Sequence, residues 1–233
     1  MTTVLITQSN YLPWRGYFAA IREADAVFLL DNVQYTRRDW RNRNRIRLND
    51  SERWLTVPVA TKGLYEAPIS SIHVSNQEWP ESHAAVLREA YRSAPGTGLI
   101  ESVAGELKRV GAAHSALSDV NRELLAVLCG MLGIRTELVT LREPDQLGAT
   151  ERLVHIARSA GADRYISGPS AAAYLNEDAF QREGIRVDYI DYSLLPPDPG
   201  GAVAEGELSI VDVLARRPTE LVALSTFSPS GSE

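Results

Sequence analysis

The first thirty residues alternate between apolar runs and a helical pattern, and this order constrains the fold more than any other feature of the chain. Residues 4–7 form a short β-branched run, and residues 26–30 (AVFLL) form a continuous apolar run that ends at Asp31. Between them, residues 17–24 carry apolar side chains at helical spacing. A strand–loop–helix–strand unit of this length predicts two neighbouring parallel strands that are buried in a sheet.

The rest of the chain repeats this alternation near its carboxyl-terminal end. Further strands are predicted at residues 54–59, 72–74, 136–139, 164–167 and 187–190, and helices at residues 81–93, 99–132, 150–160 and 208–215. Such an order predicts an α/β fold, with a mostly parallel Rossmann-like sheet, helices on both faces and a helical insert at about residues 80–132. We expect one domain over residues 1–228 and a flexible tail at residues 229–233.

Composition excludes several classes of protein. A net charge of −6 over 233 residues argues against a nucleic-acid partner. No apolar run approaches the about 20 residues that cross a bilayer, and no signal peptide is present, so we expect a cytoplasmic protein with no membrane partner. The single cysteine, Cys129, lies in an apolar run and is predicted to be inert in the core. No metal site and no cofactor are predicted, because none of the standard motifs occurs.

The loop QSNYLPWRGY (residues 8–17) follows the first predicted strand and is the strongest candidate site. Ligands of open α/β sheets bind beyond the carboxyl ends of the strands, and the next helix offers free N–H groups to an anion. Substrate binding is predicted for Gln8, Asn10, Tyr11 and Trp14. The alternative is that the aromatic residues close the end of the core.

Two further segments follow in the chain. Asp31 and Gln34 come after the second strand, where Asp31 is predicted to bind a hydroxyl group or, alternatively, to cap a turn. The basic run at residues 37–47 is open to three interpretations: a phosphate or carboxylate clamp, a solvated surface, or a nucleic-acid contact. The acidic net charge favours the clamp, formed by Arg43 or Arg45, with Asn44 orienting a hydroxyl or an amine.

Residues 165–175 (YISGPSAAAYL) follow a predicted strand near the carboxyl-terminal end of the chain. Gly168 and Pro169 predict a sharp turn after the strand. Ser167, Gly168 and Ser170 would then present hydroxyl and backbone N–H groups at the same edge of the sheet. We expect residues 8–17, 31–45 and 165–175 to converge in one cleft.

His83 is the histidine with the clearest functional pattern. Trp79, His83 and Tyr91 share one approximate face of a predicted helix. With a pKa near neutrality, His83 would act as a general base. The alternative is a structural histidine whose removal leaves partners unpaired.

These segments resemble the WbqC-like family of bacterial proteins, whose members often occur among genes for O-antigen sugars and natural products. The resemblance is carried by residues 8–18 (QSNYLPWRGYF), 28–35 (FLLDNVQY), 40–46 (WRNRNRI), 54–59 (WLTVPV), 83–95 (HAAVLREAYRSAP), 165–175 and 208–214 (LSIVDVL). Residues 192–206 depart from the family pattern, which has a Tyr-x-Gln segment there. The resemblance implies a transferase of small-molecule biosynthesis, with acyl or aminoacyl transfer to an amino-sugar or similar amine.

A fainter similarity is to pantothenate synthetases and related nucleotidylyl transferases. Their His-x-Gly-His signature would fall on residues 14–17, which are Trp-Arg-Gly-Tyr in this chain, so histidine-based adenylation is not implied. The leading hypothesis is a transferase for an amine or nucleotide-sugar, with an acyl-CoA, carrier-protein or aminoacyl donor. His83 and Asp31 are its predicted proton acceptors. The alternatives are a nucleotidyl transferase or ATP-dependent ligase, and a non-catalytic ligand-binding protein. Homo-oligomerisation stays open.

Overall fold

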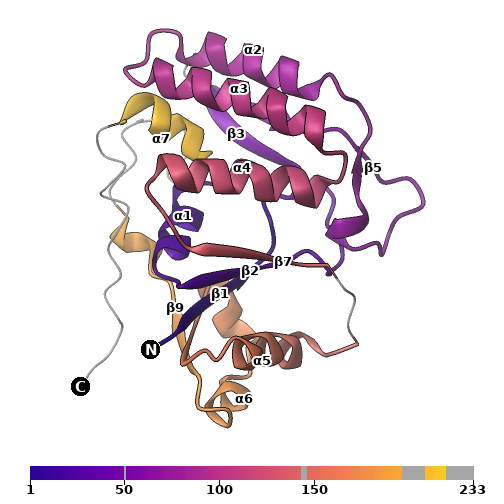
Figure 1. Cartoon of the computed structure of the whole chain (residues 1–233), viewed down its shortest axis with the longest axis vertical. Helices are drawn as coiled ribbons and strands as arrows, with labels where there is room; N and C mark the ends of the chain where they lie inside the picture. The colour runs from indigo at the N-terminus through magenta and orange to yellow at the C-terminus, as the bar shows by residue number, and fades with distance from the viewer. Residues whose placement is uncertain (50, 143–145, 196–207, 219–233) are drawn as a thin grey trace.

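A central parallel sheet organises the protein. The structure is a computed structural model that describes residues 1–49, 51–142, 146–195 and 208–218. Within these residues five strands form the sheet: β1 (Thr3–Thr7), β2 (Ala26–Leu30), β7 (Glu137–Leu141), β8 (Arg164–Ser167) and β9 (Arg186–Tyr189). They lie in the order β7-β2-β1-β8-β9, and all neighbouring pairs are parallel (Figure 1). The predicted α/β fold class is therefore confirmed.

Helices cover both faces of this sheet, as the sequence predicts. Helices α1 (Arg15–Arg22) and α4 (Leu117–Met131) lie on one side, and α5 (Ala149–Ser159) and α6 (Glu177–Gln181) on the other (Figure 1). Successive side chains of a strand point to opposite faces. Leu5 of β1 accordingly belongs to the core cluster beneath α1 and α4, while its neighbours Val4 and Ile6 belong to the cluster beneath α5 and α6.

A long insert separates β2 from β7. It contains an antiparallel hairpin of β3 (Arg43–Leu48) and β4 (Ser51–Thr56), and a smaller antiparallel pair of β5 (Val59–Ala60) and β6 (His73–Val74). The helices α2 (Trp79–Tyr91), α3 (Thr97–Ala113) and α4 follow. The insert is thus broader than the predicted helical segment, and the helical pattern of residues 99–132 divides into two helices.

The insert and the sheet share apolar contacts. One core cluster contains Leu5 and Val27 of the sheet together with Leu87 and Leu107 of the insert helices. Helix α7 (Ile210–Arg216) returns to this cluster and contacts α3 and β3. The described residues also contain three short 3-10 helices: η1 (Ile69–Ser71), η2 (Pro169–Ala173) and η3 (Tyr192–Leu194). One domain over residues 1–228 stays a prediction, and the predicted tail at residues 229–233 lies outside the described residues.

Candidate functional site

The strand order places a cleft at the point where the chain changes direction across the sheet. From β1, the strands β2 and β7 follow on one side, and β8 and β9 lie on the other. In parallel sheets, loops on the two sides of such a point diverge and leave a crevice at the carboxyl ends of the strands. A cleft of about 470 Å³ opens there, hereafter the switch-point cleft.

Residues far apart in the sequence form the walls of the switch-point cleft. The described lining residues are Ile6, Thr7, Gln8, Leu30, Val33, Arg41, Ala149, Arg152, Leu153, Tyr165, Ser167, Gly168, Ser170, Ala171 and Tyr174. They come from the ends of β1, β2 and β8, from the first turn of α5 and from the loop after β8. Residues 8–17, 31–45 and 165–175 therefore converge, as expected from the parallel sheet.

Four of the sequence-predicted binding residues lie in these walls: Gln8, Ser167, Gly168 and Ser170. Ser167 is buried, and its hydroxyl oxygen accepts a hydrogen bond from the Tyr165 hydroxyl at 3.2 Å. This side of the cleft therefore offers hydroxyl and backbone groups to a polar ligand. Binding by these residues stays a prediction.

Arg41 is the arginine of the basic run that reaches the switch-point cleft, and the sequence interpretation missed it. Its side chain is only 13% exposed. One terminal nitrogen donates a hydrogen bond to the side-chain oxygen of Asn10, and the other lies 3.6 Å from Asp39 Oδ2. Burial lowers the pKa of Arg41, and the nearby Asp39 opposes this effect. A guanidinium in this position suits a phosphate or carboxylate.

The two arginines that were predicted as the clamp do not line the switch-point cleft. Arg43 stacks on Trp54, with its guanidinium 4.2 Å from the ring centroid. Arg45 donates hydrogen bonds to both carboxylate oxygens of Glu52, at 3.0 and 2.8 Å. Both are residues of β3, so they serve the β3–β4 hairpin. Gln34 is also elsewhere: it donates to the Tyr65 carbonyl at 2.8 Å.

A buried polar network holds the loops beneath the cleft. Asp31 is fully buried, and one carboxylate oxygen accepts the Ser9 backbone N–H at 3.1 Å. Burial raises the pKa of Asp31. From α4, the Asn121 side chain donates to the Arg41 carbonyl at 2.8 Å and to the Ser9 hydroxyl at 3.2 Å. The segment that carries Arg41 is therefore fixed to the loop after β1.

His83 and Tyr11 form a pair in the core of the insert. Nδ1 of His83 lies 2.8 Å from the Tyr11 hydroxyl, and the Trp79 ring packs against both side chains. Tyr11 is fully buried and His83 is 6% exposed. Burial lowers the pKa of His83 to about 4, and burial raises the pKa of Tyr11. Neither residue is among the described lining of the switch-point cleft.

A second cavity of about 310 Å³, hereafter the aromatic cavity, adjoins the loop after β1. Its described lining is Asn10, Pro13, Trp14, Trp40, Asn44 and Tyr192. Three predicted site residues, Asn10, Trp14 and Asn44, therefore lie here rather than in the switch-point cleft. The rings of Trp14 and Tyr192 meet edge to face with centroids 4.7 Å apart.

Asn44 acts on the loop backbone. Its amide donates to the Leu12 carbonyl at 2.7 Å and to the Tyr11 carbonyl at 3.3 Å. Leu12 has a φ of 43°, which is unfavourable for a branched residue. The two hydrogen bonds stabilise this conformation, which turns the loop between the two cavities.

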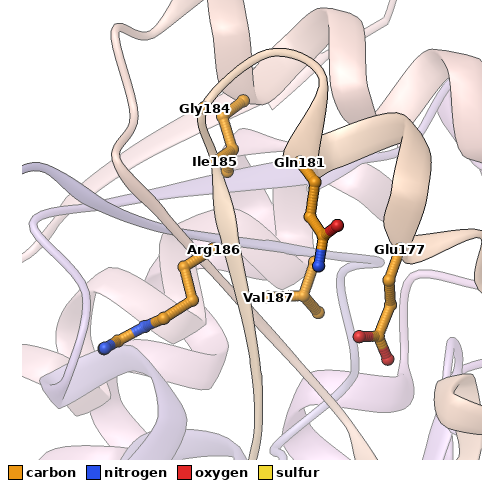
Figure 2. A pocket seen from close by; sticks show the side chains of 6 residues that line it. All are labelled: Glu177, Gln181, Gly184, Ile185, Arg186 and Val187. Atoms are coloured by element: carbon orange, nitrogen blue, oxygen red, sulfur yellow. The ribbon is translucent and has the colours of Figure 1, made fainter.

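A further hollow lies along the edge strand β9, away from the predicted residues. It measures about 300 Å³ and is lined by Glu177, Gln181, Gly184, Ile185, Arg186 and Val187. Figure 2 shows Glu177 and Gln181 extending from α6 on one side of β9, with Arg186 on the other. Glu177 accepts a hydrogen bond from Tyr189 at 2.7 Å, and Arg186 pairs with Asp188 at 3.0 Å. The charged groups of Glu177 and Arg186 thus already have partners within the protein.

Two negative findings apply to the described part of the chain. Its histidine, cysteine and acidic side chains nowhere gather in threes as a metal site would require. No helix among these residues has the length and apolar character that crossing a membrane requires.

Comparisons with known proteins place the chain in a family. A relative from Mycobacterium tuberculosis, named "Uncharacterized protein Rv1507c", is 39% identical over 193 residues, which cover 82% of this chain and 83% of that protein. No solved structure matches the chain. The model of the WbqC-like protein family matches residues 8–223, a range that contains all the described lining of the aromatic cavity and all of the switch-point cleft except Ile6 and Thr7. The chain therefore belongs to the WbqC-like protein family.

Proposed function

We propose that the protein is a small-molecule transferase that holds an anionic substrate in the switch-point cleft. One observation carries this proposal: a largely buried guanidinium, Arg41, lines the cleft together with Arg152 and the first turn of α5. Arginine binds phosphate and carboxylate groups through two parallel hydrogen bonds, and a helix amino terminus adds N–H groups and a positive dipole end. An anion is therefore the ligand that these groups fit best.

The transferred group is an acyl or aminoacyl group, and the acceptor is an amine. The amine nitrogen attacks the carbonyl carbon of the donor, the new C–N bond forms, and the C–S or C–O bond to the carrier breaks. The amine gives up its proton to a side-chain acceptor, which returns a proton to the carrier as it leaves as a thiol or an alcohol. Gln8, Ser167 and Ser170 are placed to orient hydroxyl or amine groups of the substrate. An acyl-CoA, a carrier protein or an aminoacyl donor supplies the group.

The amine must lose a proton, so the mechanism needs a proton acceptor near the switch-point cleft. Of the two sequence-predicted acceptors, Asp31 is the nearer, because it directly follows Leu30 of the cleft wall. Its raised pKa suits proton acceptance, since the efficiency of a general base increases with its basicity. His83 packs in the insert core, and burial lowers its pKa to about 4, which makes it a weak base.

A specific observation favours a second candidate function. None of the described lining residues of the switch-point cleft is a histidine, cysteine, aspartate or glutamate. Most general acids and bases belong to these residue types. A protein that binds an anionic intermediate and presents it to a partner enzyme, without catalysis of its own, fits such walls.

Binding measurements on matched variants test the proposal. We expect at least one of inorganic phosphate, UDP-N-acetylglucosamine, acetyl-CoA and ATP to raise the melting temperature, as any ligand that binds the folded state does. Arg152→Gln should weaken the binding of that ligand by about 10-fold or more, because a hydrogen bond to a charged group is worth about 1.5–3 kcal/mol. Arg158→Gln is the control: it lies on the same helix but outside the cleft, paired with Glu183 at 3.5 Å.

Equal affinities for wild type, Arg152→Gln and Arg158→Gln would overturn the proposed anion site. Acylation of an amine acceptor, followed by mass spectrometry, then separates the two functions. Turnover supports the transferase, and tight binding without turnover supports the binding protein. Magnesium dependence with pyrophosphate release would indicate nucleotidyl transfer or ligation instead.

A further inference from the structure

The aromatic cavity and the switch-point cleft meet at one pair of side chains. Asn10 lines the aromatic cavity, Arg41 lines the switch-point cleft, and the two side chains are hydrogen-bonded to each other. A ligand anchored on the Arg41 guanidinium therefore lies next to Asn10, a lining residue of the aromatic cavity. The switch-point cleft supplies charge, and the aromatic cavity supplies rings.

The wall of the aromatic cavity is a pre-formed stacking platform. Trp40 stacks on Trp54 with ring centroids 5.7 Å apart and an interplanar angle of 27°. The guanidinium of Arg45 lies within 5.6 Å of both ring centroids. Trp40 is thus held in place before any ligand arrives, so little side-chain freedom is lost on binding.

The other two aromatic side chains of the cavity lining are also fixed. A Cβ atom on Gly16 would lie 2.3 Å from the Trp14 ring, so the absence of a side chain at position 16 lets this ring fold back against the helix α1. The Tyr192 ring then packs against Trp14. Asn10 adds one side-chain amide to the same lining. Rings with an amide beside them form the usual environment of a bound nucleobase.

We infer that the aromatic cavity binds a planar heteroaromatic ring, and that the substrate is a nucleoside phosphate whose phosphate lies at Arg41. This inference rests on the proposed anion site of the switch-point cleft and names the class of substrate that it takes. A volume of about 310 Å³ lies at the lower end of the range for small-molecule pockets, which suits a single ring system. A flat ring continues the offset Trp54–Trp40 stack, the arrangement that aromatic rings prefer.

A series of probes isolates the contribution of the ring. Affinities of the full-length protein are measured by calorimetry for inorganic phosphate, ribose 5-phosphate, UMP, AMP and uridine. We expect UMP or AMP to bind about 5-fold or more tightly than ribose 5-phosphate, because base stacking on an aromatic side chain contributes about 1–3 kcal/mol. Trp40→Leu should remove this advantage and change the affinity for ribose 5-phosphate by less than about 2-fold.

A second variant and a control keep the test decisive. Tyr192→Leu removes another ring of the cavity and should also lower nucleotide affinity, so a folding defect in Trp40→Leu does not end the experiment. Tyr65→Ala removes an aromatic ring that is 70% exposed and lies outside the cavity, and it should bind every probe like wild type.

The outcomes distinguish the two proposals. If UMP, AMP and ribose 5-phosphate bind wild type equally, the ring subsite is wrong while the anion site stands. If no phosphate probe binds, the anion site and with it the nucleoside phosphate are wrong. If UMP binds no more tightly than uridine, and its affinity depends on Trp40 but not on Arg152, the ring subsite is supported and the anion site is refuted.

Discussion

Acidification should destabilise this protein through His83. Burial lowers the pKa of His83 from 6.5 to about 4 in the folded state. Between these values the unfolded chain binds a proton at this site and the folded chain does not, so the free energy of unfolding falls as the pH falls. The contribution is fully present above pH 6.5 and is lost as the pH approaches 4. This difference in pKa between the folded and the unfolded state corresponds to about 3 kcal/mol of unfolding free energy.

Replacing His83 with asparagine isolates this effect. His83 also has a hydrogen bond with the Thr56 backbone, which assigns its ring N–H to that contact and leaves Nδ1 to accept from the Tyr11 hydroxyl. An asparagine oxygen at the position of Nδ1 can accept the same hydrogen bond but does not titrate. Urea unfolding of wild type and His83→Asn is compared at pH 7.5 and pH 4.5, and groups that titrate in both proteins cancel. From pH 7.5 to pH 4.5, the free energy of unfolding should fall by about 2–3 kcal/mol more in wild type than in His83→Asn.

Two results would refute this reasoning. An identical pH dependence of the two proteins would mean that the imidazole is solvated or paired with an acid. A turnover loss of roughly 10²-fold in His83→Asn at pH 7.5, with unfolding unchanged, would support the general base that the sequence pattern indicates. The control is Tyr11→Phe, which removes the hydrogen bond at 2.8 Å but leaves the buried imidazole and its pH dependence.

Two further predictions concern packing. Gly16→Ala should lower the free energy of unfolding by roughly 1–3 kcal/mol and shift the tryptophan fluorescence, because the new Cβ atom would clash with the Trp14 ring. The control is Gly105→Ala in α3, whose Cβ atom meets no atom within 4 Å, so this variant should be neutral or stabilising. Thermal melts of both variants check this. Cys129 is 3% exposed and burial raises its pKa to about 12, so a thiol reagent should label it slowly in the native protein and quickly in urea, and Cys129→Ala should keep its activity. Rapid native labelling with loss of activity would reverse that assignment.

Much of the sheet could be predicted from the sequence because its strands contain short apolar or aromatic runs. Residues 26–30 and 164–167 match β2 and β8 in full, since AVFLL and the Tyr165–Ile166 pair within RYIS are recognised without knowledge of the neighbouring strands. Strand β3 was missed because its buried positions are not apolar throughout. Asn44 is 2% exposed and alternates with charged residues, and only its hydrogen bonds to the loop carbonyls make that burial favourable.

The site could be predicted only in part, for a related reason. The topological rule brought the loops after β1, β2 and β8 together without any knowledge of side chains. The sequence does not show which arginine reaches the cleft, because that depends on where β3 begins and how it pairs with β4. Arg43 and Arg45 lie within the paired part of the hairpin, whereas Arg41 precedes it. The contact between Tyr11 and His83 spans 72 residues, and no local pattern indicates a pairing of that kind.

We expect the insert, more than the sheet, to determine which ligands the two cavities accept. The strand ends and the first turn of α5 supply groups that suit any anion, whereas Arg41 and Trp40 both lie between β2 and β3. Helix α4 ties this segment to the loop after β1 through Asn121, and β3 ties the same loop down through Asn44. A substitution of Asn121 in α4 or Asn44 in β3 should therefore shift the Arg41–Asn10 boundary between the cavities without changing the sheet. Relatives that differ in these elements should share an anion site and differ in the ring that they accept.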